Sequence, residues 1–343
     1  MKYLITGGCG FIGTNFAQKL MERGDEVILL DNLSRKGTVA NLTYLKETYP
    51  NIEFVHADVR TDFPKLLELM EEVDAVYHLA GQVAVTTSVV NPREDFEINA
   101  LGTFNVIEAI RLSKKRPLII YSSTNKVYGG MEDIEIIKEG KKYVYKDLRG
   151  GIPEDRLLDF HSPYGCSKGA ADQYIRDYAR IFGIKSVVVR QSCIYGTRQF
   201  GVEDQGWVAW FTIAANLDKP LTIFGDGMQV RDVLFVEDLF EAWDMATKKI
   251  DEVAGDVFNI GGGPEYTMSL LELLAFLEKH LDKEIKYTFD EWRPGDQPVY
   301  VSDISKAEKV LGWKPKTTPK EGVKKLVEWT KENADLINSQ LGF

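Results

Sequence analysis

Tyr164 and Lys168 are the two residues whose types and spacing most directly suggest chemistry. They lie four residues apart in a stretch with helical periodicity, so both side chains fall on one face of the helix. An ammonium beside a phenol favours the phenolate and lowers a phenol pKa that is ordinarily about 10. The pair could therefore act as a base on a hydroxyl group. Because the same spacing is common on helix surfaces, the assignment depends on the elements that position the pair.

A glycine-rich turn near the N-terminus predicts a dinucleotide site. An apolar strand over residues 2–6 leads into Gly7, Gly10 and Gly13, and an amphipathic run follows over residues 14–23. Glycines at these positions allow a tight turn, a close approach of pyrophosphate to the backbone, and close packing of helix on strand. The N-terminus of the helix would then face the phosphates with unpaired N–H groups.

A second strand, over residues 26–30, ends at Asp31. A carboxylate there can bind the adenosine ribose hydroxyls and would repel a 2′-phosphate. We therefore predict NAD as the cofactor, and Arg35 nearby weakens this preference only slightly.

Strands and helices alternate through the first half of the chain, which predicts a Rossmann-type, doubly wound parallel sheet with a smaller C-terminal substrate-binding lobe. We assign residues 1–190 to the NAD-binding domain, with 234–260 returning to it, and residues 191–343 mainly to the substrate lobe. The predicted sheet strands are residues 2–6, 26–30, 52–55, 75–79, 118–122 and 186–189, and a helix over 236–249 and a strand over 257–260 are expected to return to the sheet.

Ligands of such sheets bind beyond the carboxyl ends of the strands, and small or polar residues gather at those ends here. The predicted cofactor contacts are Gly7, Gly10, Phe11, Ile12, Gly13, Asp31, Asn32, Ser34, Arg35, Asp58, Val59, Leu79, Ala80, Gly81, Gln82, Asn99, Ser122, Tyr164, Lys168 and Gln191.

Composition narrows the partners. The net charge of −10 argues against nucleic acid or an anionic membrane, so an anionic ligand would need a local cluster of Arg and Lys. No apolar run approaches the ~20 residues of a membrane span, and the strand that follows Met1 leaves no room for a signal peptide. Three cysteines without metal-type spacing suit a reducing cytoplasm, and we predict no metal site.

Three motifs together resemble the extended short-chain dehydrogenases/reductases, over essentially the whole chain. They are Gly-x-x-Gly-x-x-Gly, the Ser-Thr pair that ends the fifth strand, and Tyr-x-x-x-Lys. The resemblance implies that Tyr164 is the acid/base and that Thr124 orients the reacting hydroxyl, with Ser122 or Ser123 in support. It implies that Lys168 binds the nicotinamide ribose and lowers the pKa of Tyr164.

The residues after Thr124 suggest the subtype. Sugar-nucleotide dehydratases of this superfamily carry an Asp-Glu pair there, whereas this chain has Asn125-Lys126. Neither residue is a carboxylic acid, so the resemblance leaves epimerisation or simple oxidoreduction. Longer strings, over residues 122–129 and 159–174, resemble nucleotide-sugar 2-epimerases. This implies a CDP-hexose substrate, NAD that stays bound and is not consumed, and a homodimer or homotetramer.

Arg231 and Arg293 resemble residues that grip a diphosphate in related enzymes, and Arg198 is a third candidate. Lys126 could hold a hydroxyl or oxyanion or could be a solvated lysine, and Trp207 could stack on a base or belong to the core. The predicted substrate contacts are Thr124, Asn125, Lys126, Cys193, Arg198, Gln205, Gly206, Trp207, Val208, Arg231 and Arg293. Cys193 stands where many relatives have a stronger hydrogen-bonding Asn.

Three alternatives remain open. The chain could be a 2-epimerase of another CDP- or GDP-hexose, a 4-epimerase, or a non-catalytic NAD-sensing protein. Residues 131–160 form a charged insertion with a hairpin, to which we assign no function. We expect Tyr174, Tyr178 and Phe182 to lie in the core, because they recur at helical spacing.

Overall fold

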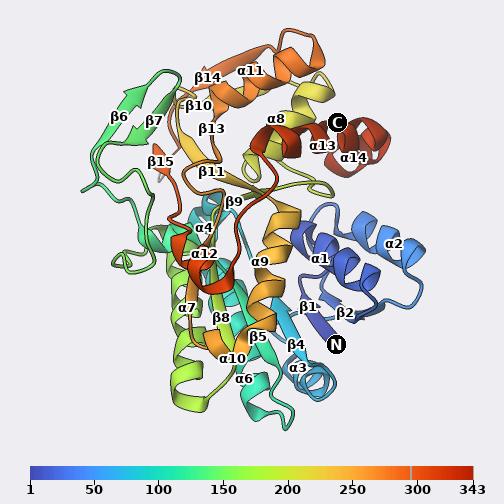
Figure 1. The fold of residues 1–343 in the computed structure, drawn as a ribbon. Coiled ribbons are helices and arrows are strands. Elements are labelled where there is room, and N and C mark those ends of the chain that lie inside the picture. The colour runs from blue at the N-terminus through green and yellow to red at the C-terminus, as the bar shows by residue number, and fades with distance from the viewer. Residues whose placement is uncertain (294–295, 343) are drawn as a thin grey trace.

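Seven parallel strands form the central sheet of the N-terminal lobe (Figure 1). The computed structural model describes residues 1–293 and 296–342. The strand order is β12-β8-β5-β4-β1-β2-β3, which confirms the predicted Rossmann-type doubly wound sheet. The strands are β1 (Lys2–Thr6), β2 (Glu26–Asp31), β3 (Glu53–His56), β4 (Ala75–His78), β5 (Leu118–Thr124), β8 (Ser186–Gln191) and β12 (Val257–Ile260).

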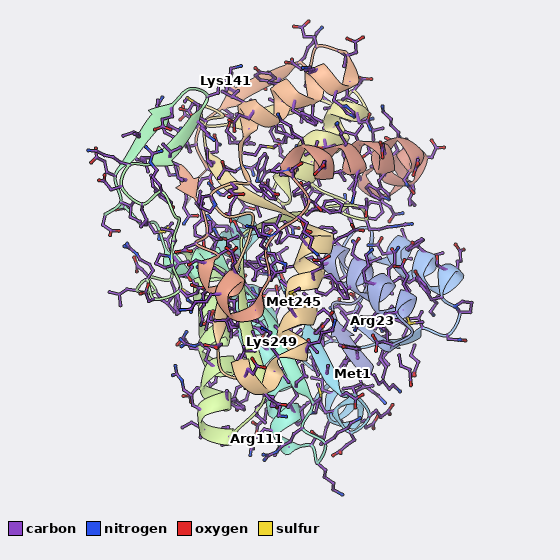
Figure 2. The ribbon with its side chains drawn as sticks, viewed as in Figure 1. Met1, Arg23, Arg111, Lys141, Met245 and Lys249 are labelled. Atoms are coloured by element: carbon purple, nitrogen blue, oxygen red, sulfur yellow. The ribbon has the colours of Figure 1, made fainter. Side chains whose placement is uncertain are left out.

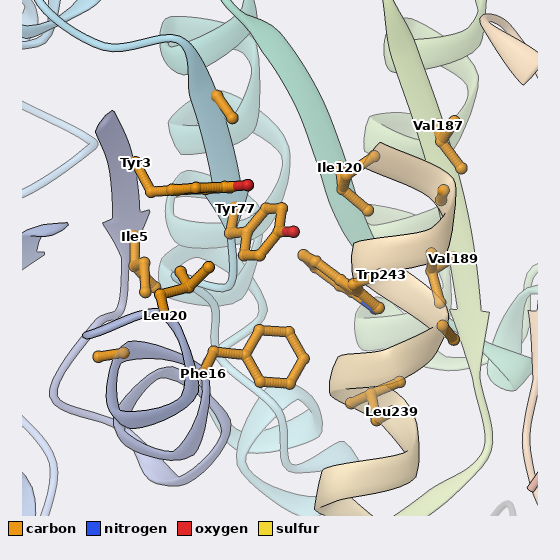
Figure 3. Close-up of a cluster of buried hydrophobic side chains, with 14 of the residues drawn as sticks. Tyr3, Ile5, Phe16, Leu20, Tyr77, Ile120, Val187, Val189, Leu239 and Trp243 are labelled. Atoms are coloured by element: carbon orange, nitrogen blue, oxygen red, sulfur yellow. The ribbon is translucent and has the colours of Figure 1, made fainter. Parts of the chain in front are cut away.

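Alternate residues of each strand feed two separate cores, because successive side chains point to opposite faces of a sheet. Tyr3 and Ile5 of β1 pack in one core, and Leu4 between them packs in the other. Figure 3 shows the first core, where the rings of Phe16 and Trp243 meet edge-on with centroids 5.3 Å apart. Since both faces are buried, inner strands such as β2 carry unbroken apolar runs rather than an alternating pattern, whereas the edge strand β3 is partly exposed.

Helices cover both faces of the sheet. The face of Tyr3 is covered by α1 (Phe11–Glu22), α2 (Thr38–Thr48), α9 (Val236–Lys248), α10 (Ile250–Val253) and α12 (Ser305–Leu311). The face of Leu4 is covered by α3 (Phe63–Met70), α6 (Gly102–Leu112) and α7 (Ser162–Phe182).

The single helix expected over residues 92–113 is divided into three pieces. These are α5 (Pro92–Phe96), a π-helical turn η1 (Glu97–Leu101) and α6, with α4 (Val85–Val90) just before them. A π turn inside a helix frequently marks a functional site. Here it contains Asn99, which is fully buried.

A further core, around α8 (Trp207–Asn216), belongs to the smaller lobe. After β8 the chain enters this lobe and then comes back through α9 to β12, which pairs with β8 at the edge of the main sheet. The other elements of the lobe are β9 (Cys193–Tyr195), β10 (Leu221–Phe224), β11 (Val230–Phe235), β13 (Thr267–Ser269), α11 (Leu270–Leu281), β14 (Tyr287–Asp290), β15 (Val299–Tyr300), α13 (Pro319–Glu332) and α14 (Ala334–Leu341).

The insertion forms the antiparallel hairpin β6 (Ile136–Glu139) and β7 (Lys142–Tyr145). Lys141 lies at its tip, at the outer edge of the molecule (Figure 2). The hairpin is attached to the smaller lobe, since the Tyr145 hydroxyl donates to the Val299 carbonyl at 3.0 Å and the Tyr143 N–H donates to the Met228 carbonyl at 3.0 Å.

The expectation of a buried aromatic row on α7 is only partly correct. Tyr178 is 7% exposed, whereas Tyr174 is 49% and Phe182 39% exposed. Helical spacing places residues on one face but does not decide how far the neighbouring helix covers that face. Among the described residues, no helix has the length and apolarity to cross a membrane, and no group of His, Cys, Asp or Glu side chains is arranged to hold a metal ion.

Candidate active site

A cleft of about 830 Å³ runs from the glycine turn of the first lobe to the arginines of the second. It is lined by nearly every residue predicted to bind cofactor or substrate, from segments that span Gly7 to Arg293. The two exceptions are Asn99, which is buried beside Lys168, and Val208, which is 1% exposed in the core of the smaller lobe. The structure therefore brings the predicted site together, except for the Val208 side chain.

The glycine turn is a cradle made of bare backbone. A Cβ on Gly13 would lie 2.5 Å from the Gly7 carbonyl oxygen, and a Cβ on Gly7 would lie 2.8 Å from the Ala80 nitrogen. The N-cap of α1 is Gly10, whose position provides no side-chain cap for the first-turn N–H groups. Backbone N–H groups at a helix start that no side chain covers fit a diphosphate.

Two acids at neighbouring strand ends are fixed in place. The Asp31 carboxylate accepts the backbone N–H groups of Cys9 at 3.0 Å and Leu33 at 2.8 Å. The Asp58 carboxylate pairs with Arg60 at 2.7 Å, and this hydrogen bond is the main reason that its pKa is lowered to about 2. Both carboxylates are therefore held by the protein in the position predicted for adenosine contacts.

Thr124 and Tyr164 meet where β5 ends beside the first turn of α7. The Thr124 hydroxyl accepts the Lys126 N–H at 3.2 Å, and the Tyr164 N–H donates to Ser88 Oγ at 3.2 Å. Burial raises the pKa of the Tyr164 phenol to about 12, while its interaction with the Thr124 hydroxyl lowers it in part. A threonine hydroxyl and a buried phenol side by side can hold one substrate hydroxyl between them.

Lys168 contacts β5, the strand that also ends in Thr124. Its ammonium donates to the Ser122 carbonyl and lies 4.5 Å from the centroid of the Tyr121 ring. Burial lowers the pKa of Lys168 to about 7. The expectation that Lys168 brings the pKa of Tyr164 below its ordinary value is not met in this structure, because burial of the phenol outweighs the groups that favour the phenolate.

The turn after Thr124 is the 3-10 helix η2 (Asn125–Tyr128), and it carries no carboxylate at the two positions that follow Thr124. The Lys126 ammonium donates to Gln297 Oε1 at 3.1 Å. Burial, followed by the charge of Arg231, lowers the pKa of Lys126 to about 8. This ammonium is thus part of the cleft wall rather than a solvated lysine.

Cations gather at the far end of the cleft, as an anionic ligand requires in a chain of net charge −10. Arg231 pairs with Asp296 at 2.6 Å, and Arg293 pairs with Asp204 at 3.4 Å. Arg198, the third predicted diphosphate contact, lies instead against the first lobe, over the Tyr44 ring of α2 and 3.4 Å from its centroid.

Cys193 and Trp207 both line this end of the cleft. Burial raises the pKa of the Cys193 thiol to about 12, so it is a neutral, weak hydrogen-bonding group. Trp207 is half-buried, with one side toward the cleft and the other packed on the core of the smaller lobe.

Several lining residues were missed by sequence reasoning. Phe224 and Gln229 flank the turn between β10 and β11, and Asp296 and Asp204 are the partners of the two arginines. The rule that ligands bind at strand ends could have found Phe224, because it ends an apolar strand. The acids carried no local signal, since their role comes from an arginine far away in the sequence.

The doubly wound sheet, the glycine cradle and the Thr-Tyr-Lys cluster define an extended short-chain dehydrogenase/reductase. A family model described as GDP-mannose 4,6 dehydratase matches residues 4–326, and the chain belongs to this family.

Its relatives include epimerases. CDP-paratose 2-epimerase of Salmonella typhi is 48% identical over 337 residues, covering 96% of this chain and 99% of that protein. UDP-glucose 4-epimerase of Thermotoga maritima, solved with UDP-glucose, has 32% identity and a TM-score of 0.84, covering 97% of this chain and 100% of that one. UDP-glucuronic acid 4-epimerase of Bacillus cereus, solved with UDP-glucuronic acid and NAD, has 29% identity and a TM-score of 0.83, covering 97% and 99%.

Proposed function

We propose that this protein inverts C2 of a nucleotide-activated hexose in a NAD-dependent reaction and converts CDP-paratose to CDP-tyvelose. The observation that carries the proposal is the Thr124-Asn125-Lys126 turn facing Tyr164. It combines the groups needed to oxidise a carbinol with the absence of an acid pair at positions 125 and 126. The 48% identical CDP-paratose 2-epimerase supports the choice of carbon and of nucleotide.

Each end of the cleft has a defined task in this proposal. The glycine cradle and Asp31 hold NAD by its diphosphate and adenosine ribose, and Arg231 and Arg293 hold the diphosphate of the substrate. Arginine suits this role because its planar fork can donate two parallel hydrogen bonds to phosphate. The hexose then lies between them, beside Thr124.

The chemistry is a redox cycle with no net redox change. Tyr164 takes the proton of the C2 hydroxyl while Thr124 fixes the oxygen. A NAD⁺ held by the glycine cradle and Asp31 would supply the hydride chemistry, taking up the C2 hydride and giving it back to the opposite face of the 2-ketose. Tyr164 then gives the proton back to the oxygen, so C2 is inverted and all atoms and electrons balance. Lys126 and Asn125 are positioned to hold neighbouring hydroxyls or the developing oxyanion.

Tyr164→Phe tests the proposal, with Tyr178→Phe as a matched control on the same helix. Removing the acid/base should lower kcat by about 10²–10⁴-fold while NAD stays bound. Tyr178 donates to Glu108 away from the cleft, so its variant should turn over like the wild type. Full activity of Tyr164→Phe would refute the assignment. In deuterated water, C2 of the product should carry no solvent deuterium.

Inversion at C4 is the second candidate, because solved relatives with TM-scores of 0.83–0.84 are 4-epimerases. A panel of CDP-, GDP- and UDP-hexoses, with the inverted carbon located by NMR, separates the two reactions. Inversion at C2 of the CDP sugar is expected, and inversion at C4 alone would replace the proposal.

We also propose a cytoplasmic homodimer or homotetramer. Exposed apolar side chains on the outer faces of α6 and α7, among them Leu112, Tyr174 and Ile181, support a helix-paired interface. Light scattering should give a multiple of 38.8 kDa, and a monomer at micromolar concentration would contradict it.

A further inference from the structure

Asp95 is a buried carboxylate behind the catalytic pocket that neither the motifs nor the proposed reaction uses. It lies on α5, is 1% exposed, and accepts the Ser167 hydroxyl at 2.5 Å and the Asn99 amide at 3.1 Å. Both of these hydrogen-bond partners are neutral groups. A buried charge satisfied only by a hydroxyl and an amide is costly, so its persistence calls for a nearby cation.

The partners of Asp95 place it against the Tyr164–Lys168 helix. Ser167 immediately precedes Lys168 and also donates to the Tyr164 carbonyl at 3.1 Å. Asn99 accepts the Gln82 N–H at 2.9 Å. A Cβ on Gly81 would lie 3.0 Å from Asn99 Oδ1 and 3.7 Å from Lys168 Nζ. Asp95 is thus fixed, through two short contacts, beside the residues that flank the Lys168 ammonium.

The other carboxylate near Lys168 is already neutralised. Asp172, one helical turn after Lys168, is 0% exposed and pairs with Arg190 through two bonds of 2.9 and 3.1 Å. It also accepts the Ser123 hydroxyl at 2.8 Å. Of the two buried acids that face Lys168, only Asp95 has negative charge left for it.

The remaining groups around the pair are neutral or distant from Asp95. Tyr121 of β5 lies under the Lys168 ammonium, and burial raises the pKa of its phenol. Burial and the nearby Lys168 lower the pKa of His78 of β4 to about 3, so this side chain is a neutral imidazole between Thr6 and Thr103. On the cleft side, the Arg35 guanidinium favours the Tyr164 phenolate.

We propose that Asp95 is a positioning residue that supplies the counter-charge of Lys168 and so favours the form of the pair in which Lys168 is an ammonium and the Tyr164 phenol has given up its proton. This inference rests on the proposed acid/base role of Tyr164. Asp95 favours the protonated form of both groups, and it opposes the burial that deprotonates Lys168. Without the Asp95 charge, Tyr164 and Lys168 together lose their first proton at lower pH. A larger share of that loss then comes from the Lys168 ammonium rather than from the Tyr164 phenol.

Asp95→Asn tests this, because the amide keeps the shape and removes the charge. We expect the acid limb of the pH–kcat profile to move down by about one pH unit, the effect of one charge several ångströms away at an effective dielectric constant of about 20. We expect kcat at pH 8 to fall about ten-fold with KM for the nucleotide sugar unchanged. Ser167→Ala, the matched control, removes the hydrogen bond but keeps the charge and should leave the limb in place.

An unmoved acid limb in Asp95→Asn, or an equal shift in Ser167→Ala, would overturn the proposal. A thermal test covers the case in which Asp95→Asn does not fold or no sugar is turned over. Lys168→Met alone leaves the buried Asp95 carboxylate without its counter-charge. The double variant Lys168→Met/Asp95→Asn should therefore have a higher Tm than Lys168→Met, because it contains neither charge. A lower Tm in that double variant would refute the pairing whatever the substrate is, whereas a raised Tm without turnover would point to failure of the proposed function alone.

Discussion

The two ends of the cleft are built from different parts of the polypeptide. At the cofactor end the wall of the cleft is made of backbone atoms, such as the Gly7 carbonyl that lies against Gly13. The Asp31 carboxylate there accepts backbone N–H groups. At the substrate end they are long side chains that pair with one another, as Arg231 does with Asp296. The cofactor end is therefore fixed by the fold, and the substrate end by exchangeable ion pairs.

This difference matches a cofactor that stays and a substrate that leaves. Partly exposed ion pairs contribute only about 0–1 kcal/mol, so an incoming diphosphate can replace them. Charge-assisted bonds from arginine to phosphate are roughly twice as strong as neutral ones. A backbone cradle cannot be exchanged in this way, because any added atom collides with the main chain.

The largest effect is expected from Gly13→Ala, which disrupts the glycine turn at the cofactor end of the cleft. Its Cβ would lie 2.5–2.8 Å from backbone atoms of Gly7 and Gly8, none of which can rotate away. We expect loss of bound NAD, loss of at least 100-fold in activity, and destabilisation of ~1–3 kcal/mol. Chromatography of released cofactor and a thermal melt measure these.

Gly150→Ala is the matched control for the cradle, because a Cβ there would meet nothing within 4 Å. Retention of NAD in Gly13→Ala would show that the glycine turn can move to accommodate a side chain and is no more rigid than the substrate end.

Arg231→Met removes one of the ion-paired arginines at the substrate end of the cleft. Losing one charge-assisted contact to a diphosphate costs about 1.5–3 kcal/mol, so KM for the nucleotide sugar should rise about 10–100-fold while NAD stays bound. Arg149→Met serves as control, since Arg149 is an exposed, ion-paired arginine of the insertion. Loss of NAD instead of a raised KM would place Arg231 at the other end of the cleft.

Asp296→Asn should have a smaller effect of opposite sign. It frees Arg231 from its partner, so KM should fall about 2–5-fold, in keeping with a partly exposed pair worth up to ~1 kcal/mol. Asp251→Asn removes the partner of the exposed Lys185 and should change nothing. A raised KM in Asp296→Asn would mean that this carboxylate contacts the substrate itself.

The smallest effect concerns the pH dependence of the stability that Asp58 contributes at the cofactor end. The pKa of Asp58 is lowered to about 2 by Arg60, so its carboxylate stabilises the folded state above pH 4 and loses this contribution as the pH falls toward 2. The Tm difference between the wild type and Asp58→Asn should therefore be largest near neutral pH and shrink as the pH falls from 4 toward 2. A difference that does not change with pH would show that shape, not charge, is what Asp58 contributes.

The sequence by itself determined the parts of this protein that depend on local pattern. Apolar runs predicted the sheet strands to within a few residues, including the returning strand over 257–260, and the strand-end rule put Gly81 and Thr124 in the cleft. The family followed from short motifs, since glycines, a strand-end threonine and the Tyr164 helix each carry their chemistry within a few residues.

Only the tertiary structure decided what depends on burial and on distant partners. It turned Lys168 toward Ser122, left Tyr174 exposed, and paired Arg231 with an acid 65 residues away. Periodicity predicts which residues share a face. The packing of remote segments determines how far that face is buried from solvent and which charges lie close together there. Because the pKa values of Tyr164 and Lys168 depend on those two quantities, the sequence could name the pair that we propose as catalytic but could not determine its protonation.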